Sequence, residues 1–110
     1  MKAIRYHEFG GVEVLKYEDV PEPEIGDNEV LVRVKAVSLN HLDLRLRSGK
    51  SPRPVNLPHI GGVDIAGDVA GVGENVSDLR PGTRVVIEPA IKSKKGIEVV
   101  GVNLYGGFAE

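Results

Sequence analysis

Residues Leu57 to Pro89, LPHIGGVDIAGDVAGVGENVSDLRPGTRVVIEP, decide the fold, and their pattern predicts a strand, a turn and a second strand. Glycines interrupt the apolar residues of the first strand at positions 61, 62, 67, 71 and 73. Glycine at this density weakens a flat strand but permits a sharp bend at a barrel corner or a bulge. Asp78 to Gly82 supplies the turn, and Arg84 to Ile87 predicts a short β-branched strand that stops before Pro89. The chain is therefore expected to close around a bent hairpin.

The segments before this hairpin predict three more strands. Lys2 to Tyr6 and Val14 to Glu18 are expected to pair as a hairpin, and the proline-rich loop from Pro21 to Asn28 follows them. Glu29 to Leu39 is the clearest strand, because its apolar and basic residues alternate with a period of two. The apolar face consists of Val30, Val32, Val34 and Ala36. Because Val37 and Leu39 extend the apolar character to the second face, we expect the far end of this strand to be covered.

Asn40 to Gly49 is the one good helix candidate. Asn40 can cap its N-terminus, and Asp43 stands at the third helical position, where a negative charge suits the helix dipole. Arg45 and Arg47 lie near the C-terminus, and Gly49 can take the left-handed conformation that ends a helix. At fewer than three turns, this helix depends on packing for its stability.

The rest of the chain predicts loops and one more strand. Lys50 to Pro58 contains three prolines and is expected to form a loop, and Ile91 to Gly96 is expected to form a basic turn. Ile97 to Leu104 predicts another apolar strand. Many short strands, one or two short helices and frequent glycine and proline turns predict a mainly β fold, a partly open barrel, with residues 1–110 as a single domain.

Composition excludes several classes of function. A net charge of −2 offers no electrostatic footprint for nucleic acid or an anionic membrane. No apolar run is long enough to span a bilayer, and no secretory signal opens the sequence, so a cytoplasmic protein is expected. The chain has no cysteine, which excludes disulfides, thiolate chemistry and the softest zinc ligand.

Two motifs invite a binding function that their context does not favour. Gly71-Val72-Gly73 starts like a dinucleotide-binding loop, but Val76 occupies the third glycine position and no helix follows, so barrel-corner glycines are expected. His7, His41 and His59 could join Asp43 and Asp64 in binding a metal. Because these residues lack metal-ligand spacing, we expect ordinary, partly exposed histidines and no metal site.

Asn40, His41 and Asp43 are the candidate site residues, because they cluster where a strand leads into a helix. Such junctions often line clefts, and polar groups there can orient a substrate. The simpler interpretation is that Asn40 and Asp43 only cap the helix, and the residues by themselves favour it.

The chain resembles the N-terminal domain of the medium-chain dehydrogenase/reductase superfamily along nearly its whole length. The resemblance is carried by MKAI at 1–4, EVLVRV at 29–34, NHLD at 40–43, RSG at 47–49, GVDIAG at 62–67, VG at 72–73, PGTRVV at 81–86 and GGFAE at 106–110. It implies a GroES-like barrel, which agrees with the strand pattern. The chain differs from the family's Pro-Gly-Asp-Arg turn by having Thr83, and Ile91 to Leu104 has no clear counterpart in the family.

The resemblance also implies which branch of the superfamily is closest. Zinc alcohol dehydrogenases carry a cysteine where this chain has Asn40, and Gly-His-Glu where it has Gly62-Val63-Asp64. Their four-cysteine zinc lobe would follow Pro89, where no cysteine occurs. Asn40 and Asp43 are more similar to the zinc-independent quinone oxidoreductases, in which the corresponding residues border the substrate and nicotinamide cleft.

Family members continue into a Rossmann domain that binds NAD(P)H, and this sequence holds no such domain. Hydride transfer needs the cofactor held against the substrate, so we expect no cofactor-binding residues in this chain and no catalysis by it alone. An excised or engineered oxidoreductase domain is the leading hypothesis. Self-association through an uncovered apolar face is expected to accompany it.

Two other hypotheses stay open. The chain could be a co-chaperonin-like binding module that forms an oligomeric ring, because Val69 to Ile87 broadly resembles the co-chaperonin hairpin. Lys50 to Gly62 would then imitate its mobile loop, although the three prolines fit that role poorly. The chain could also be a subunit that receives its Rossmann half from a separate polypeptide.

Overall fold

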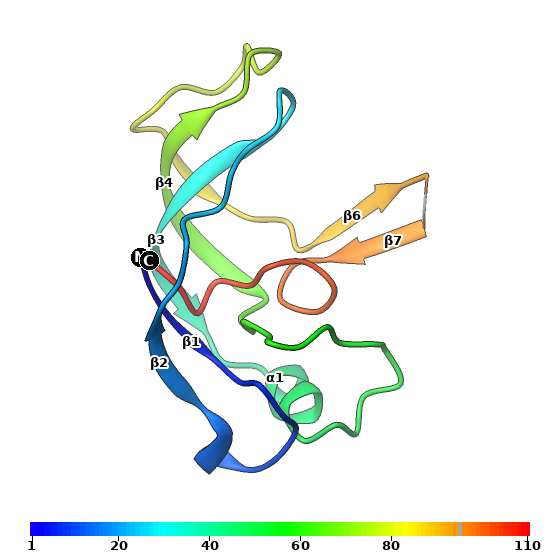
Figure 1. Ribbon diagram of the computed structural model, residues 1–110. Helices are drawn as coiled ribbons and strands as arrows, with labels where there is room; N and C mark the ends of the chain where they lie inside the picture. The colour runs from blue at the N-terminus through cyan, green and yellow to red at the C-terminus, as the bar shows by residue number, and fades with distance from the viewer. Residues whose placement is uncertain (95) are drawn as a thin grey trace.

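The computed structural model describes residues 1–94 and 96–110, apart from the side chain of Ser93, and shows a mainly β molecule (Figure 1). In chain order, the elements are β1 (Lys2–Arg5), the 3₁₀ turn η1 (Val12–Val14), β2 (Lys16–Asp19), β3 (Val30–Ser38), α1 (His41–Arg47), β4 (Asp64–Val72), β5 (Arg84–Val86), β6 (Ala90–Ser93) and β7 (Gly96–Val99). The strands form three antiparallel sheets that do not close into a barrel. The predicted fold class, a partly open GroES-like barrel with one or two short helices, is confirmed. The described residues include no helix long and apolar enough to cross a membrane.

The central sheet has the strand order β3-β4-β5 and contains the hairpin predicted from the sequence. Ile65 and Val69 of β4 are buried, whereas Asp64 and Ala70 on the opposite face are exposed. A Cβ atom at Gly67 would overlap the carbonyl oxygen of Arg33 on the neighbouring strand. Glycine is therefore required at this point by the close approach of the two backbones.

Two irregularities in the pairing of β3 with β4 change which side chains of β3 are covered. The register shifts between Leu31 and Val32 and again between Val34 and Ala36. Ala36 is exposed as a result, although the alternation placed it on the buried face. The expectation that the far end of β3 is covered is also wrong, since Val37 is 42% and Leu39 80% exposed.

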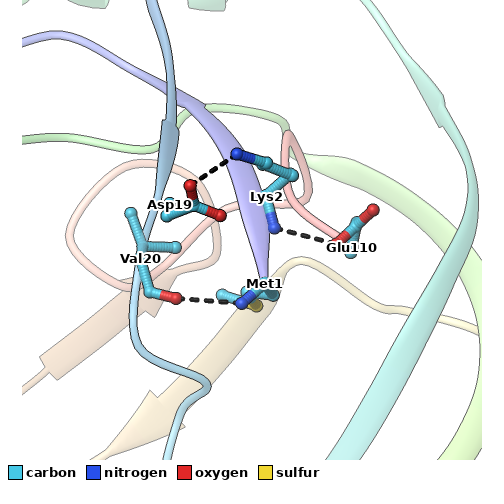
Figure 2. A network of polar contacts seen from close by, with 5 residues as sticks. All are labelled: Met1, Lys2, Asp19, Val20 and Glu110. Atoms are coloured by element: carbon cyan, nitrogen blue, oxygen red, sulfur yellow. Dashed lines mark hydrogen bonds and ion pairs between the residues drawn. The ribbon is translucent and has the colours of Figure 1, made fainter.

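The two ends of the chain lie side by side and extend the first sheet (Figures 1 and 2). β1 pairs with β2, and on its other edge Ile4 N donates to the carbonyl of Phe108 at 2.7 Å. The N-terminal ammonium donates to the carbonyl of Val20 at 3.0 Å, and the backbone N–H of Lys2 donates to the carboxylate of Glu110 at 2.8 Å. The last residues of the chain thus form an isolated antiparallel bridge with β1, between Ala109 and Ala3.

Several predicted boundaries are wrong. Val14 belongs to η1 rather than to a strand, because the chain makes one 3₁₀ turn before β2. Ile91 to Ser93 form β6 instead of a basic turn, and their partner β7 ends at Val99 rather than at Leu104. Residues 101–103 turn the chain instead. In both places pairing with a neighbouring strand decides the outcome, and single-residue preferences do not reveal such pairing.

The core consists of two small clusters rather than one layer. The first joins Ala3, Val20 and Ile60, against which Phe108 and Ala109 pack. The second joins Leu46 of α1 to Val63 and Val102, with Leu42, Val55 and Val99 around it. The second cluster fixes α1 against the segment that precedes β4, and so it positions the strand-to-helix junction.

Candidate functional site

The strand-to-helix junction between β3 and α1 is the candidate site, and Asp43 is its buried centre. Asp43 is 8% exposed and lies in the first turn of α1. Its Oδ2 accepts a hydrogen bond from the backbone N–H of Asn40 at 2.7 Å, and its Oδ1 accepts one from the backbone N–H of Gly62 at 3.0 Å. The carboxylate therefore caps the helix and also fastens it to the segment before β4.

Asn40 connects the same junction to β4. Its side-chain Nδ2 donates to Oδ2 of Asp64 at 2.9 Å, and the hydroxyl of Ser38 donates to the same oxygen at 3.0 Å. These two hydrogen bonds lower the pKa of Asp64. Asn40 as a whole is half-buried.

His41 differs from its two neighbours in the candidate set. It is exposed at the first position of α1, and its side chain makes no hydrogen bond or ion pair with any described residue. The structure therefore brings the three predicted site residues together at one junction, with Asp43 and Asn40 holding the backbone and His41 directed outward. The capping interpretation is correct for Asp43.

Sequence reasoning missed a buried polar cluster beneath the site. His59 is 6% exposed, so the expectation of a partly exposed histidine is wrong at this position. Its Nε2 donates a hydrogen bond to the carbonyl oxygen of Gly101 at 2.9 Å. Its ring meets the ring of Tyr6 edge-on, with 5.3 Å between the two ring centroids. Burial lowers the pKa of His59. A backbone bridge between Tyr6 and His59 brings the two rings together, and no local sequence pattern signals that pairing.

Tyr6 completes this cluster. Burial, reinforced by the negative charge of Asp43, raises the pKa of Tyr6 to about 12, so its hydroxyl keeps its proton at neutral pH. That hydroxyl and Nε of Arg47 are buried without a hydrogen-bond partner. Arg47 belongs to α1, and Tyr6 lies close to that helix. Among the described residues, this region therefore holds the buried side-chain atoms that lack a hydrogen-bond partner.

The residues do not fit a zinc ion. Val63, which stands where zinc-binding relatives would have a histidine, is packed in the cluster of Leu46 and Val102. Across residues 1–94 and 96–110, no three histidine, cysteine, aspartate or glutamate side chains gather as metal ligands. Gly73 lies directly after β4, and its N–H donates to the carbonyl of Glu29 at 2.9 Å.

Two hollows lie on the surface of the described residues. The first is an apolar groove of about 320 Å³ between β1, β2 and β3, and the last residues of the chain form part of its wall. The second has a volume of about 450 Å³ and lies against α1, directly beside His41. Its lining residues are His41, Leu44, Arg45, Arg47, Ser48 and Lys50.

Known proteins of similar sequence are oxidoreductases. Residues 26–110 match the family described as alcohol dehydrogenase GroES-like domain. A quinone oxidoreductase from Lama guanicoe is 45% identical over 86 residues, which cover 77% of this chain and 26% of that protein. A chloroplastic NADPH-dependent alkenal/one oxidoreductase from Arabidopsis thaliana is 41% identical over 112 residues, which cover 100% of this chain and 28% of that protein.

Solved structures agree with this result. The crystal structure of an NAD-dependent alcohol dehydrogenase superposes with a TM-score of 0.90 at 36% identity, covering 96% of this chain and 35% of that one. This chain spans only 25% to 30% of the length of the curated relatives that it matches. On the match of residues 26–110, supported by these relatives, the chain belongs to the alcohol dehydrogenase GroES-like domain family.

Proposed function

We propose that this chain forms the substrate-side domain of an NAD(P)H-dependent oxidoreductase of the quinone oxidoreductase type, with Asn40, His41 and Asp43 at the border of the substrate cleft. The observation that carries the proposal is the match of the whole chain, at 40% identity, to the quinone oxidoreductase of Homo sapiens. The structure adds that Asn40 bonds to Asp64 at the junction, and that Val63, packed nearby, supplies no zinc ligand. A reduction that does not depend on zinc fits these residues best.

Each of the three residues has a separate role in this proposal. Asp43 positions the junction through its two backbone hydrogen bonds and does not touch the substrate. His41 is exposed and can donate a hydrogen bond from its ring to a carbonyl oxygen of a quinone or an enone. Asn40 holds one wall of the cleft against Asp64. The nicotinamide cofactor, when bound by the rest of such an enzyme, supplies the hydride.

The chain by itself is expected to be inactive, because its described residues form antiparallel sheets rather than the parallel, helix-flanked sheet that binds dinucleotides. The test is a chimera in which this chain replaces the matching segment of the human quinone oxidoreductase. We expect the chimera to oxidise NADPH in the presence of a quinone, and we expect the purified 110-residue chain to show no turnover.

Variants of the chimera test the site. Replacing His41 by Ala should raise the KM for the quinone, whereas replacing His7, an exposed histidine that follows β1 and bonds to Glu18, should leave it unchanged. A folded chimera without activity, or turnover by the chain alone, would overturn the proposal.

We also propose that the isolated chain associates with a second copy of itself through its uncovered apolar side chains. Val86 on the outermost strand of the central sheet is 82% exposed, and Leu39 beyond the end of β3 is 80% exposed. β3 and β5 are the edge strands of that sheet, and unpaired edges favour pairing between molecules.

Sedimentation velocity over a wide range of protein concentrations tests this association. We expect a dimer or larger species that the replacement of Val86 by Lys abolishes. Replacing Val12 by Lys, at an exposed position on η1 away from this sheet, should have no effect. A chain that stays monomeric at every concentration would contradict the proposal.

A further inference from the structure

The hollow beside α1 has a cationic lining. Arg45, Arg47 and Lys50 contribute positive charge, and the lining contains no aspartate or glutamate. This concentration of positive charge is local, because the chain as a whole carries a net charge of −2. None of the ion pairs among the described residues involves these three side chains, so their charges are not neutralised by neighbours within ion-pair distance.

The end of α1 brings these side chains to one place. Gly49 adopts a φ of +72°, which lets the chain reverse direction directly after the helix. Lys50 N then donates to the carbonyl of Arg45 at 3.1 Å, and so Lys50 is folded back beside the helix that it follows. Figure 1 shows α1 and the loop that leaves it in the lower part of the molecule.

Arg47 is the lining residue with an unsatisfied polar atom. Its Nε is buried and makes no hydrogen bond, although buried N–H groups of arginine are normally paired. Arg47 also lines the hollow and forms no ion pair with a described residue, so its charge adds to that of Arg45 and Lys50.

We propose that this hollow, formed by Arg45, Arg47 and Lys50, is a binding site for a phosphate-bearing small molecule. Arginine pairs with phosphate through two parallel N–H···O bonds, and lysine binds phosphate as a point charge. Leu44 supplies an apolar wall, and the volume of about 450 Å³ accommodates more than a single phosphate group. The phosphate can belong to a free metabolite or to a dinucleotide. This inference does not depend on the proposed oxidoreductase function.

Calorimetric titration of the 110-residue chain with inorganic pyrophosphate at low ionic strength tests the site. We expect saturable one-to-one binding that weakens as sodium chloride is added. Because Arg45 and Lys50 are exposed and their side chains form no hydrogen bond or ion pair with a described residue, Arg45→Gln and Lys50→Gln should keep the far-ultraviolet circular dichroism spectrum. Each should weaken binding roughly tenfold, as expected for the loss of one charge-assisted hydrogen bond.

Arg33→Gln is the matched control, because Arg33 is an exposed arginine on β3 outside the hollow. Equal weakening by this variant, or heats that never saturate, would overturn the proposal. A parallel titration with NADPH identifies the source of the phosphate. Binding of NADPH that also depends on Arg45 and Lys50 supports a dinucleotide, and binding of pyrophosphate without NADPH supports a smaller phosphorylated compound.

Discussion

Asp43 bonds to a segment 19 residues further along the chain. Removing its carboxylate should show how much this bond and the helix cap stabilise the fold. Replacing Asp43 by Ala leaves the backbone N–H groups of Asn40 and Gly62 buried or half-buried without their acceptor. Because an unpaired buried donor costs about 1–3 kcal/mol, we expect the free energy of unfolding to fall by about 2–4 kcal/mol. Urea denaturation, monitored by circular dichroism, measures this loss in the free energy of unfolding.

The matched control for Asp43 is Asp78, an exposed aspartate in the turn before β5 whose side chain makes no hydrogen bond with a described residue. Replacing Asp78 by Ala should change the free energy of unfolding by no more than about 0.5 kcal/mol. Similar losses in the two variants would show that the carboxylate of Asp43 does not fasten the helix.

His59 makes the stability of the chain depend on pH. Burial places the pKa of His59 in the folded chain below its ordinary value of 6.5, whereas the unfolded chain keeps that value. The unfolded state therefore binds more protons between the two values, and stability falls as the pH drops below 6.5 toward the folded pKa. Above 6.5 the full stability is present. The midpoint of urea denaturation should decrease between pH 7.5 and about pH 5.5.

Replacing His59 by Gln separates this effect from the titration of other groups. The amide of glutamine can still donate to the carbonyl of Gly101, but it does not titrate. We expect the variant to lose most of the pH dependence in this range. The carboxyl groups of Glu13, Glu18 and Asp64, whose pKa values are lowered, titrate at more acidic pH. An unchanged pH dependence in the variant would assign the effect to another residue.

At the scale of elements, the pairing of β3 with β4 depends on Gly67. Replacing Gly67 by Ala would place a methyl group against the carbonyl oxygen of Arg33, and backbone cannot move aside as a flexible side chain can. We expect the variant to lose about 1–3 kcal/mol of stability, as overpacked sites do. Thermal and urea denaturation measure the loss.

Gly71 on the same strand is the control, because a Cβ there would lie 3.7 Å from the side chain of Ile25, an ordinary contact. Replacing Gly71 by Ala should be neutral or should stabilise the chain by up to about 1 kcal/mol, since alanine loses less backbone entropy than glycine. If the two variants are equally unstable, the close approach at Gly67 is not the cause.

The elements that could be predicted from the sequence are those whose signals are local. The strand β3, predicted from its period-two alternation, is confirmed, as are the glycine and proline turn between β4 and β5 and the helix from His41 to Arg47. β6 was missed because its residues become a strand only by pairing with β7. The bulges that expose Ala36 and Val37 were missed for the same reason, since a register shift is a property of two strands together.

At the scale of the whole molecule, the candidate site also combines features with a local sequence signal and features that depend on distant contacts. Asn40, His41 and Asp43 are neighbours in sequence, so their cluster at one junction could be predicted. The buried pair of Tyr6 and His59 lies 53 positions apart along the chain, and the cationic hollow depends on how the chain turns after Gly49. Contacts of this kind follow from the overall path of the backbone.

The side chain of Phe108 lies where the ends of the chain meet the segment before β4. It packs on the core cluster of Ala3, Val20 and Ile60, and its backbone N–H donates to the carbonyl of Gly61 at 3.0 Å. Replacing Phe108 by Ala removes partly buried aromatic surface, and we expect a loss of about 2–4 kcal/mol. The chain has one other phenylalanine, Phe9, which is 46% exposed, and its replacement by Ala should cost clearly less.

Hydrogen exchange distinguishes a local from a molecule-wide effect of the Phe108 variant. The amide of Ile4 bonds to the carbonyl of Phe108, and the amide of Gly62 bonds to Asp43 beside the ring. If Phe108 couples the chain ends to the junction, both amides should exchange faster in the variant by a larger factor than the amide of Val69, which bonds to Thr83 in the far part of the central sheet. Faster exchange at Ile4 with unchanged exchange at Gly62 would confine the role of Phe108 to the terminal strand.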